Sequence, residues 1–132
     1  MRSQDEELKV NPMACYAYPV FTEPNIHYRL HAHRNHELVL VQHGRFRSQV
    51  CGEEYVAVAG DILLYTAHTP HEDWAEGDNT VMTWACGFEW NGFGPDEPVY
   101  RRDTDGNVQH LAEQLTGWYL RGLNVEPELQ HP

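Results

Sequence analysis

The residues best suited to chemistry in this sequence are histidines. His31 and His33 are separated by one residue, and Glu37 has the same parity, so in a strand their side chains lie on one face. His71 follows a Thr69-Pro70 turn and can reach the same face from a distant strand. Imidazole and carboxylate groups in this ratio are typical ligands of Zn, Fe, Mn, Ni or Cu. The pattern therefore predicts a polar site at which these four side chains converge.

The same four groups also suit a pocket without metal, because a carbonyl or a carboxylate can satisfy a buried imidazole. Tyr65 and Trp74 are predicted to lie nearby, where aromatic rings stack on a sugar or another flat ligand. Arg29 and Arg45 are alternatives for holding an anionic ligand. Two predictions stay open, a divalent transition metal (Zn, Ni, Fe or Mn) or a metal-free ligand site. The metal ligands would be His31, His33, Glu37 and His71, and the ligand site would add Tyr65 and Trp74 to them.

Strands are the elements expected to position these residues. The stretch 13–90 is rich in Val, Tyr, Trp, Phe and Thr, and turn signals such as Cys51-Gly52-Glu53 recur roughly every ten residues. The predicted strands are 13–21, 26–33, 37–43, 45–51, 54–58, 61–66, 71–75 and 80–89. About eight strands close a barrel whose interior holds side chains or one small ligand. The sequence thus predicts an antiparallel barrel or sandwich.

A loop and a helix are predicted to follow the strands. Residues 91–106 are rich in glycine and proline and predict a loop. Apolar residues then recur at helical spacing over 107–122, with Asp105 or Asn107 as the cap and Gly122 at the end. The run 38–41 is apolar on both faces, so its outer face must be covered. Two covers are open: packing of the helix on its own barrel, or a dimer interface. The stripe expected to do this is Leu111, Leu115 and Trp118, with Tyr119 beside it.

Composition limits the classes of function. The 132 residues suit one domain, and 9 basic against 20 acidic residues give a net charge of −11. Such a chain is a poor partner for DNA, a polyanion that needs clustered Lys and Arg. No run of about 18 apolar residues predicts a membrane span, and the acidic start is unlike a signal peptide. A cytoplasmic location is expected. The widely spaced Cys15, Cys51 and Cys86 are expected to be small buried apolar residues in a reducing compartment.

Two motifs carry a family resemblance. The pattern His31-x-His33-x3-Glu37-x6-Gly44 resembles the first cupin motif, and the stretch from Gly60 to His71 resembles the second. In cupins, these histidines and this glutamate often bind a metal. The resemblance implies an all-β, cupin-type double-stranded β-helix, or jelly-roll barrel, with one C-terminal α-helix. The expected organisation is a mobile lead-in over 1–12, a barrel over 13–106 and an amphipathic helix over 107–123, which a dimer could use.

A narrower resemblance covers roughly residues 20–120. The segments that carry this resemblance are Glu37-Leu38-Val39-Leu40-Val41, Gly60-Asp61 and Pro70-His71. They are similar to the N-terminal effector-binding domain of AraC-type transcription regulators. This implies a small-molecule effector, such as a sugar or another metabolite, a homodimer, and DNA binding through a helix-turn-helix part. That part has no counterpart in this chain, so we expect a piece of a longer protein. We favour this sensor over the alternative, a stand-alone metal-dependent cupin enzyme (isomerase or dioxygenase).

Overall fold

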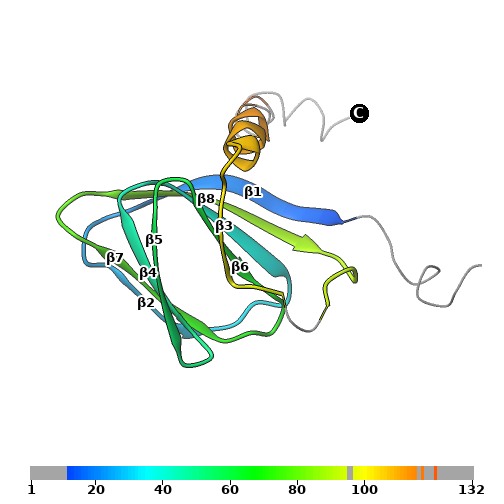
Figure 1. Ribbon diagram of the computed structural model, residues 1–132, viewed down its shortest axis with the longest axis horizontal. Coiled ribbons are helices and arrows are strands. Elements are labelled where there is room, and N and C mark those ends of the chain that lie inside the picture. The colour runs from blue at the N-terminus through cyan, green and yellow to red at the C-terminus, as the bar shows by residue number, and fades with distance from the viewer. Residues whose placement is uncertain (1–11, 95–96, 116, 118–120, 122–132) are drawn as a thin grey trace, which may run out of the picture.

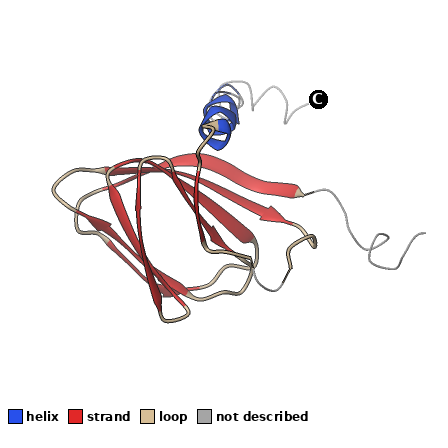
Figure 2. Ribbon diagram, in the orientation of Figure 1, coloured by secondary structure: helices blue, strands red, loops and turns tan. Residues whose placement is uncertain are grey.

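Strands build most of the protein. The computed structural model describes residues 12–94, 97–115, 117 and 121. Within these residues the chain forms nine strands and one helix (Figures 1 and 2). The strands are β1 (Met13–Thr22), β2 (His27–His31), β3 (His36–His43), β4 (Arg45–Val50), β5 (Glu53–Val58), β6 (Asp61–Tyr65), β7 (His71–Glu76), β8 (Val81–Glu89) and β9 (Tyr100–Arg102). The helix covers 107–115, and residues 117 and 121 are also helical.

Two antiparallel sheets face each other, and the jelly-roll prediction is confirmed. One sheet has the order β1-β8-β3-β6-β9 and the other β2-β7-β4-β5 (Figure 1). All eight predicted strands are present, with bounds within two residues of the prediction. The predicted loop over 91–106 was wrong at β9, which pairs with Asp61–Leu63 of β6. Local sequence does not show this short strand because its hydrogen bonds come from a partner distant in the chain.

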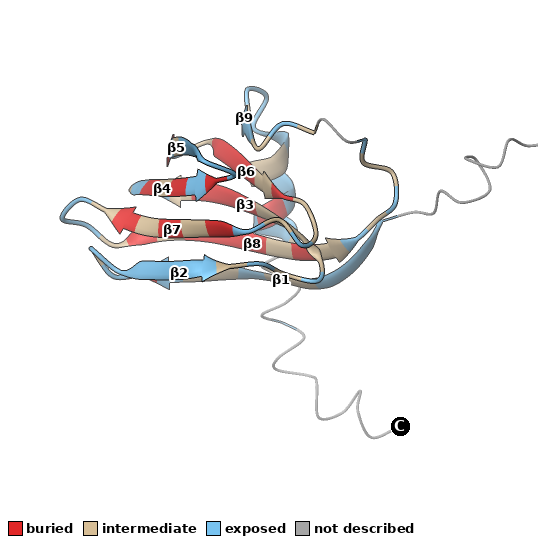
Figure 3. Cartoon of the chain, turned by 90° about the horizontal axis from the view of Figure 1, so that it is seen from below, coloured by how far each residue is buried: buried red, intermediate tan, exposed pale blue. Residues whose placement is uncertain are grey.

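The core between the sheets follows from strand alternation. Inward positions of β3, β4, β6, β7 and β8 are buried, while outward positions of the four-stranded sheet are exposed or half-buried (Figure 3). The buried apolar cluster consists of Val39, Val41, Phe46, Val50, Ala57, Leu63, Tyr65, Ala75 and Val81. The tight turn between β4 and β5 needs positive φ at both Cys51 and Gly52, as expected for a glycine-containing hairpin.

The helix lies on the outer face of the five-stranded sheet (Figure 1). Val108, Ala112 and Leu115 pack there against Leu40 and other side chains of the sheet. The chain therefore covers its own apolar strand, one of the two expected arrangements. Leu111 was wrongly placed on this stripe: it is 55% exposed, because the face that packs is one residue further along. Trp118, Tyr119 and the predicted end at Gly122 lie outside the described residues, as do residues 1–11.

Asp103 caps the helix, and this corrects the prediction of Asp105 or Asn107. Its carboxylate accepts hydrogen bonds from the backbone N–H groups of Val108 (3.1 Å) and Gln109 (3.0 Å). Asp103 lies before the turn that contains Gly106 and is not adjacent to the first helical residue, so the spacing of apolar residues in the helix did not identify it as the cap. The three cysteines are free thiols, but the expectation that they are buried was wrong for Cys15 and Cys51, which are exposed. Within the described part, no helix is both long and apolar enough to cross a membrane.

Asp61 ties β9 to the barrel. Its side chain is 2% exposed, and its Oδ1 accepts a hydrogen bond from Arg102 Nη1 at 2.8 Å. Its Oδ2 accepts one from the backbone N–H of Val58 at 2.9 Å. The Gly60-Asp61 pair of the sequence motif is thus a structural anchor rather than part of the histidine cluster.

We expect Asp61→Ala to lower the free energy of unfolding by about 2 kcal/mol, because it leaves the Val58 N–H without its partner. Urea denaturation followed by circular dichroism measures this. Asp78→Ala, in an exposed turn, removes the same group at little cost and serves as the control. Equal stability of the two variants would contradict the anchoring role.

Candidate functional site

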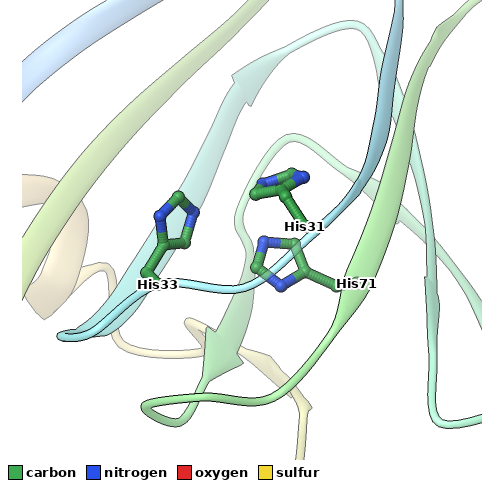
Figure 4. A group of neighbouring side chains, drawn as sticks. All are labelled: His31, His33 and His71. Atoms are coloured by element: carbon green, nitrogen blue, oxygen red, sulfur yellow. The ribbon is translucent and has the colours of Figure 1, made fainter.

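Three histidines from separate positions meet inside the barrel. His31 ends β2, His33 follows it, and His71 begins β7 opposite His31 in the sheet register (Figure 4). The ring centroids of His31 and His71 are 4.2 Å apart, and that of His33 lies 4.8 Å from His31 and 5.3 Å from His71. One nitrogen from each ring lies within 4.8 Å of the others. The structure thus brings together three of the four residues predicted from spacing.

Backbone carbonyls fix the orientation of two of these rings. His31 Nδ1 donates to the carbonyl oxygen of Arg29 at 2.6 Å, and His71 Nδ1 donates to that of Thr69 at 3.0 Å. A carbonyl only accepts, so in the neutral rings the proton is on Nδ1 and the lone pair on Nε2. His71 Nε2 is buried and has no hydrogen-bond partner among the described residues. Such an unsatisfied buried nitrogen marks a position suited to a ligand atom or an ion.

Glu37 lies beside the cluster rather than within it. Its Oε1 is 3.6 Å from His33 Nε2, too far for a good hydrogen bond. Its Oε2 accepts a hydrogen bond of 2.5 Å from the Tyr16 hydroxyl. One carboxylate oxygen is therefore held by β1, and the other faces the histidines.

A buried network of three polar side chains, Ser48, Tyr65 and Asp73, lies next to His71. The Tyr65 ring stacks on the His71 ring with centroids 3.8 Å apart and an interplanar angle of 3°. Asp73 Oδ1 accepts hydrogen bonds from Ser48 Oγ (2.6 Å) and the Tyr65 hydroxyl (3.0 Å). Asp73 Oδ2 lies 3.9 Å from His71 Nε2. Tyr65, predicted as a ligand contact, instead lies behind His71 and outside the residues that line the cavity.

Burial dominates the protonation equilibria here. It lowers the pKa of His71 below 6.5, since the low-dielectric surroundings disfavour the imidazolium. Burial also raises the pKa of Asp73, although Ser48, His71 and Tyr65 partly offset this by stabilising the carboxylate. The pKa of Tyr65 is raised by burial and by the charge of Asp73. At neutral pH the site therefore offers a neutral His71 imidazole beside buried acidic groups.

A cavity of about 210 Å³ opens next to these groups. Pockets for drug-sized ligands measure about 300–1,000 Å³, so this one suits a smaller molecule. Thr22 Oγ1 and the Tyr28 hydroxyl are hydrogen-bonded to each other at 2.8 Å on its wall. The lining residues are Tyr18, Val20, Thr22, Tyr28, His31, His33, Glu37, Val39, Phe46, Asp73, Thr83 and Ala85.

Several predicted contacts lie elsewhere. Trp74 is on the outer face of the four-stranded sheet, stacked on His27 at 4.9 Å with the Arg47 guanidinium 4.1 Å from its ring. Alternation along β7 requires this, because His71 and Asp73 point inward. Arg45 is also outside, paired with Glu76, and Arg29 is exposed and does not line the cavity.

His36 and His68 have structural contacts. His36 points away from Glu37, as its parity predicts, but it is half-buried: Nε2 donates to the Trp90 carbonyl, and Nδ1 accepts from the Ala67 N–H. His68 is exposed, and its backbone N–H donates to the His33 carbonyl at 2.7 Å. That bond ties the loop before His71 to the segment that carries His33.

Sequence reasoning missed Asp73, Ser48 and Tyr16. A signal for Asp73 existed, because it shares the parity of His71 on one strand. Ser48 and Tyr16 reach the site through strand pairing between distant segments, and local spacing does not encode that pairing.

Solved structures of low sequence identity share this architecture. A predicted oxalate decarboxylase from Thermotoga maritima matches with a TM-score of 0.55 and 18% identity, over 58% of this chain and 68% of that one. A cupin superfamily protein from Desulfitobacterium hafniense matches with a TM-score of 0.50 and 14% identity, over 54% of this chain and 63% of that one. At such identity these likenesses establish the fold, which is that of the cupins.

The family follows from the sequence match. Residues 18–97 match the model of the AraC-like ligand binding domain, and the chain belongs to that family. No protein with a curated function matches the chain. The matched segment runs from β1, past the cavity-lining residues of β8, to the stretch before β9.

The lowered pKa of His71 predicts a pH dependence of stability for the metal-free protein. The unfolded chain takes up a proton near pH 6.5, whereas folded His71 does so only at lower pH. This contribution to the free energy of unfolding is thus complete above pH 6.5 and lost as the pH falls through that value. Urea denaturation in chelator from pH 5 to 8 measures it (about the range in which histidine titrates). His71→Gln should flatten the dependence, whereas exposed His43→Gln should retain it; equal slopes would contradict the assignment.

Proposed function

We propose that this chain is the small-molecule effector-binding sensor domain of an AraC-type transcription regulator that works in the cytoplasm. The observation that carries the proposal is the cavity between the sheets, where a polar end formed by His31, His33 and Asp73 meets an apolar wall. A small metabolite with hydroxyl or carbonyl groups finds donors and acceptors at one end and apolar contact along the wall. Membership of the ligand-binding family supports this assignment.

The effector's oxygens would be placed by three kinds of group. The Nε2 lone pair of His31 accepts a hydrogen bond, and Asp73 Oδ2 accepts another, whereas His71 is buried and lies outside the cavity-lining residues. The hydroxyls of Thr22 and Tyr28 both donate and accept. None of the described cavity-lining residues is Arg or Lys, so this wall favours a neutral, hydroxylated ligand such as a sugar over an anion.

Strand β8 offers a route from the cavity to the helix. Thr83 and Ala85 line the cavity, whereas Trp84 points the other way and packs in the cluster with Ala112 of the helix. A ligand that shifts β8 therefore changes how the helix packs on the sheet. The size of this change is limited by the difference between the ligand's affinities for the two packing arrangements. In this proposal a homodimer forms through the helix, where Leu111 is exposed, and DNA is contacted by a segment outside this chain.

Titration of sugars and other small metabolites tests the proposal. We expect at least one to raise the melting temperature and change tryptophan fluorescence, since saturation at 100 Kd adds about 2.7 kcal/mol to stability. Asp73→Asn should weaken that ligand about tenfold, because hydrogen bonds to charged groups are worth about 1.5–3 kcal/mol. Asp78→Asn, the same change in an exposed turn, should bind as the wild type does. A folded barrel that responds to no metabolite would contradict the sensor role.

The site also fits a divalent transition metal, as cupins often hold. His31 and His71 present Nε2 lone pairs with Nδ1 held by a carbonyl, the arrangement usual for metal-binding histidines. The residues that would hold the ion are His31, His33 and His71, with Glu37 as the fourth candidate. Such an ion would polarise an oxygen of the bound molecule. The unsatisfied His71 Nε2 favours this second candidate, in which the domain is a metal-dependent cupin enzyme or a sensor that uses the ion for binding.

Metal binding can be measured directly on protein purified without nickel and stripped with chelator. Zn²⁺ added in excess should raise the melting temperature of the wild type, and calorimetry should give one site per chain. His71→Gln should remove the effect, whereas the exposed His43→Gln should not. If both variants bind zinc as the wild type does, the cluster is not a metal centre, and the metal-free pocket is the correct alternative.

A further inference from the structure

The Tyr16 hydroxyl is linked to the Glu37 carboxylate across an intervening strand. In the five-stranded sheet, Tyr16 of β1 pairs with Gly87 of β8, and Gly87 pairs with Glu37 of β3. The three residues thus form one row across the sheet, with the glycine in the middle. The 2.5 Å hydrogen bond between Tyr16 and Glu37 Oε2 spans this row.

Gly87 makes this reach possible. A Cβ atom built on Gly87 would lie 2.1 Å from the Tyr16 ring, far inside any allowed contact. The ring therefore lies directly over the glycine, in space that any other residue would fill. Here glycine serves close approach rather than backbone flexibility, since Gly87 is not among the positive-φ residues.

A bulge in β1 adjoins the same row. The register shifts between Ala14 and Tyr16, so Cys15 is an extra residue opposite no partner in β8. Bulges bend a strand locally and are frequent next to functional sites, where they direct a side chain. The bulge in β1 and the missing side chain of Gly87 together allow the Tyr16 hydroxyl to donate a hydrogen bond to Glu37 Oε2. This is the carboxylate oxygen that does not face the histidines.

We propose that Tyr16 is a positioning residue that fixes the Glu37 carboxylate, so that Oε1 alone is presented to the histidine cluster. Oε2 is occupied by the phenol, and Oε1 remains 3.6 Å from His33 Nε2. Two ligand atoms of one ion, each about 2.0–2.2 Å from it, lie at a similar separation. Glu37 would thus contribute a single oxygen to an ion held by the three histidines. This inference rests on the metal centre suggested above and assigns to it a residue outside the cavity lining.

Cobalt(II) titration of chelator-stripped full chain tests this, with visible absorption reporting both affinity and ligand geometry. We expect Tyr16→Phe to weaken Co²⁺ binding about tenfold or more, the usual effect of losing a hydrogen bond to a metal ligand. In a Glu37→Gln background the same change should cost little further, because Tyr16 acts through Glu37. Gly87→Ala should reproduce the loss by displacing the ring. Tyr55→Phe, which removes a hydroxyl from a side chain packed elsewhere on the core, is the matched control.

Each outcome decides the inference. An unchanged affinity in Tyr16→Phe, or an equal loss with and without Glu37, overturns it. If Gly87→Ala fails to fold, the hydroxyl deletion and the double variant still carry the test. If the wild type binds no cobalt, the metal centre and this inference both fall. The effector proposal then stands or falls separately on the metabolite titration.

Discussion

The site depends on two hydrogen bonds that hold imidazole rings to the backbone. Carbonyls of Arg29 and Thr69 each take a proton from Nδ1, and this turns the Nε2 lone pairs of His31 and His71 into the space between the sheets. A ring free to flip would present a proton or a lone pair at random. Because both carbonyls belong to residues two positions before their histidines, each bond is local to one segment. The barrel then needs only to bring the two segments together.

The polar residues inside the barrel are tolerated because most are bonded to each other. Asp73 has one oxygen satisfied by Ser48 and Tyr65, whose ring also covers His71. Removing any member would leave a buried polar group without a partner, which costs more than the bond itself contributes. Among the described residues, two buried side-chain nitrogens have no hydrogen-bond partner: Trp84 Nε1 and His71 Nε2. Trp84 packs in the apolar cluster with Ala112, whereas His71 lies within reach of the potential ligand atoms of His31 and His33, so His71 Nε2 is the one that supports a bound ion or ligand atom.

The alternation of side chains along single strands explains which site residues could be predicted from the sequence. His31, His33 and His71 were found because alternation and turns are local, and the same alternation would have added Asp73 and removed Trp74 had it been followed further along β7. Relations between strands could not be obtained in this way. The short strand β9 depends on pairing with β6, and the reach of Tyr16 to Glu37 depends on which residue of β8 separates them. Leu111 was misplaced because spacing gives a helical stripe but not its rotation against the barrel.

Strands β3 and β8 connect the cavity to the helix, because one face of each strand lines the cavity and the other packs in the cluster with the helix. In β8, Thr83 and Ala85 line the cavity, and Trp84 between them packs with Ala112 on the outside. In β3, Val39 lines the cavity and the adjacent Leu40 packs in the same outer cluster. A close-packed cluster transmits displacement because it has little free volume to absorb it. The cavity on one side of these two strands and the helix on the other are thus separated by one layer of backbone, and the proposed sensor role relies on this arrangement.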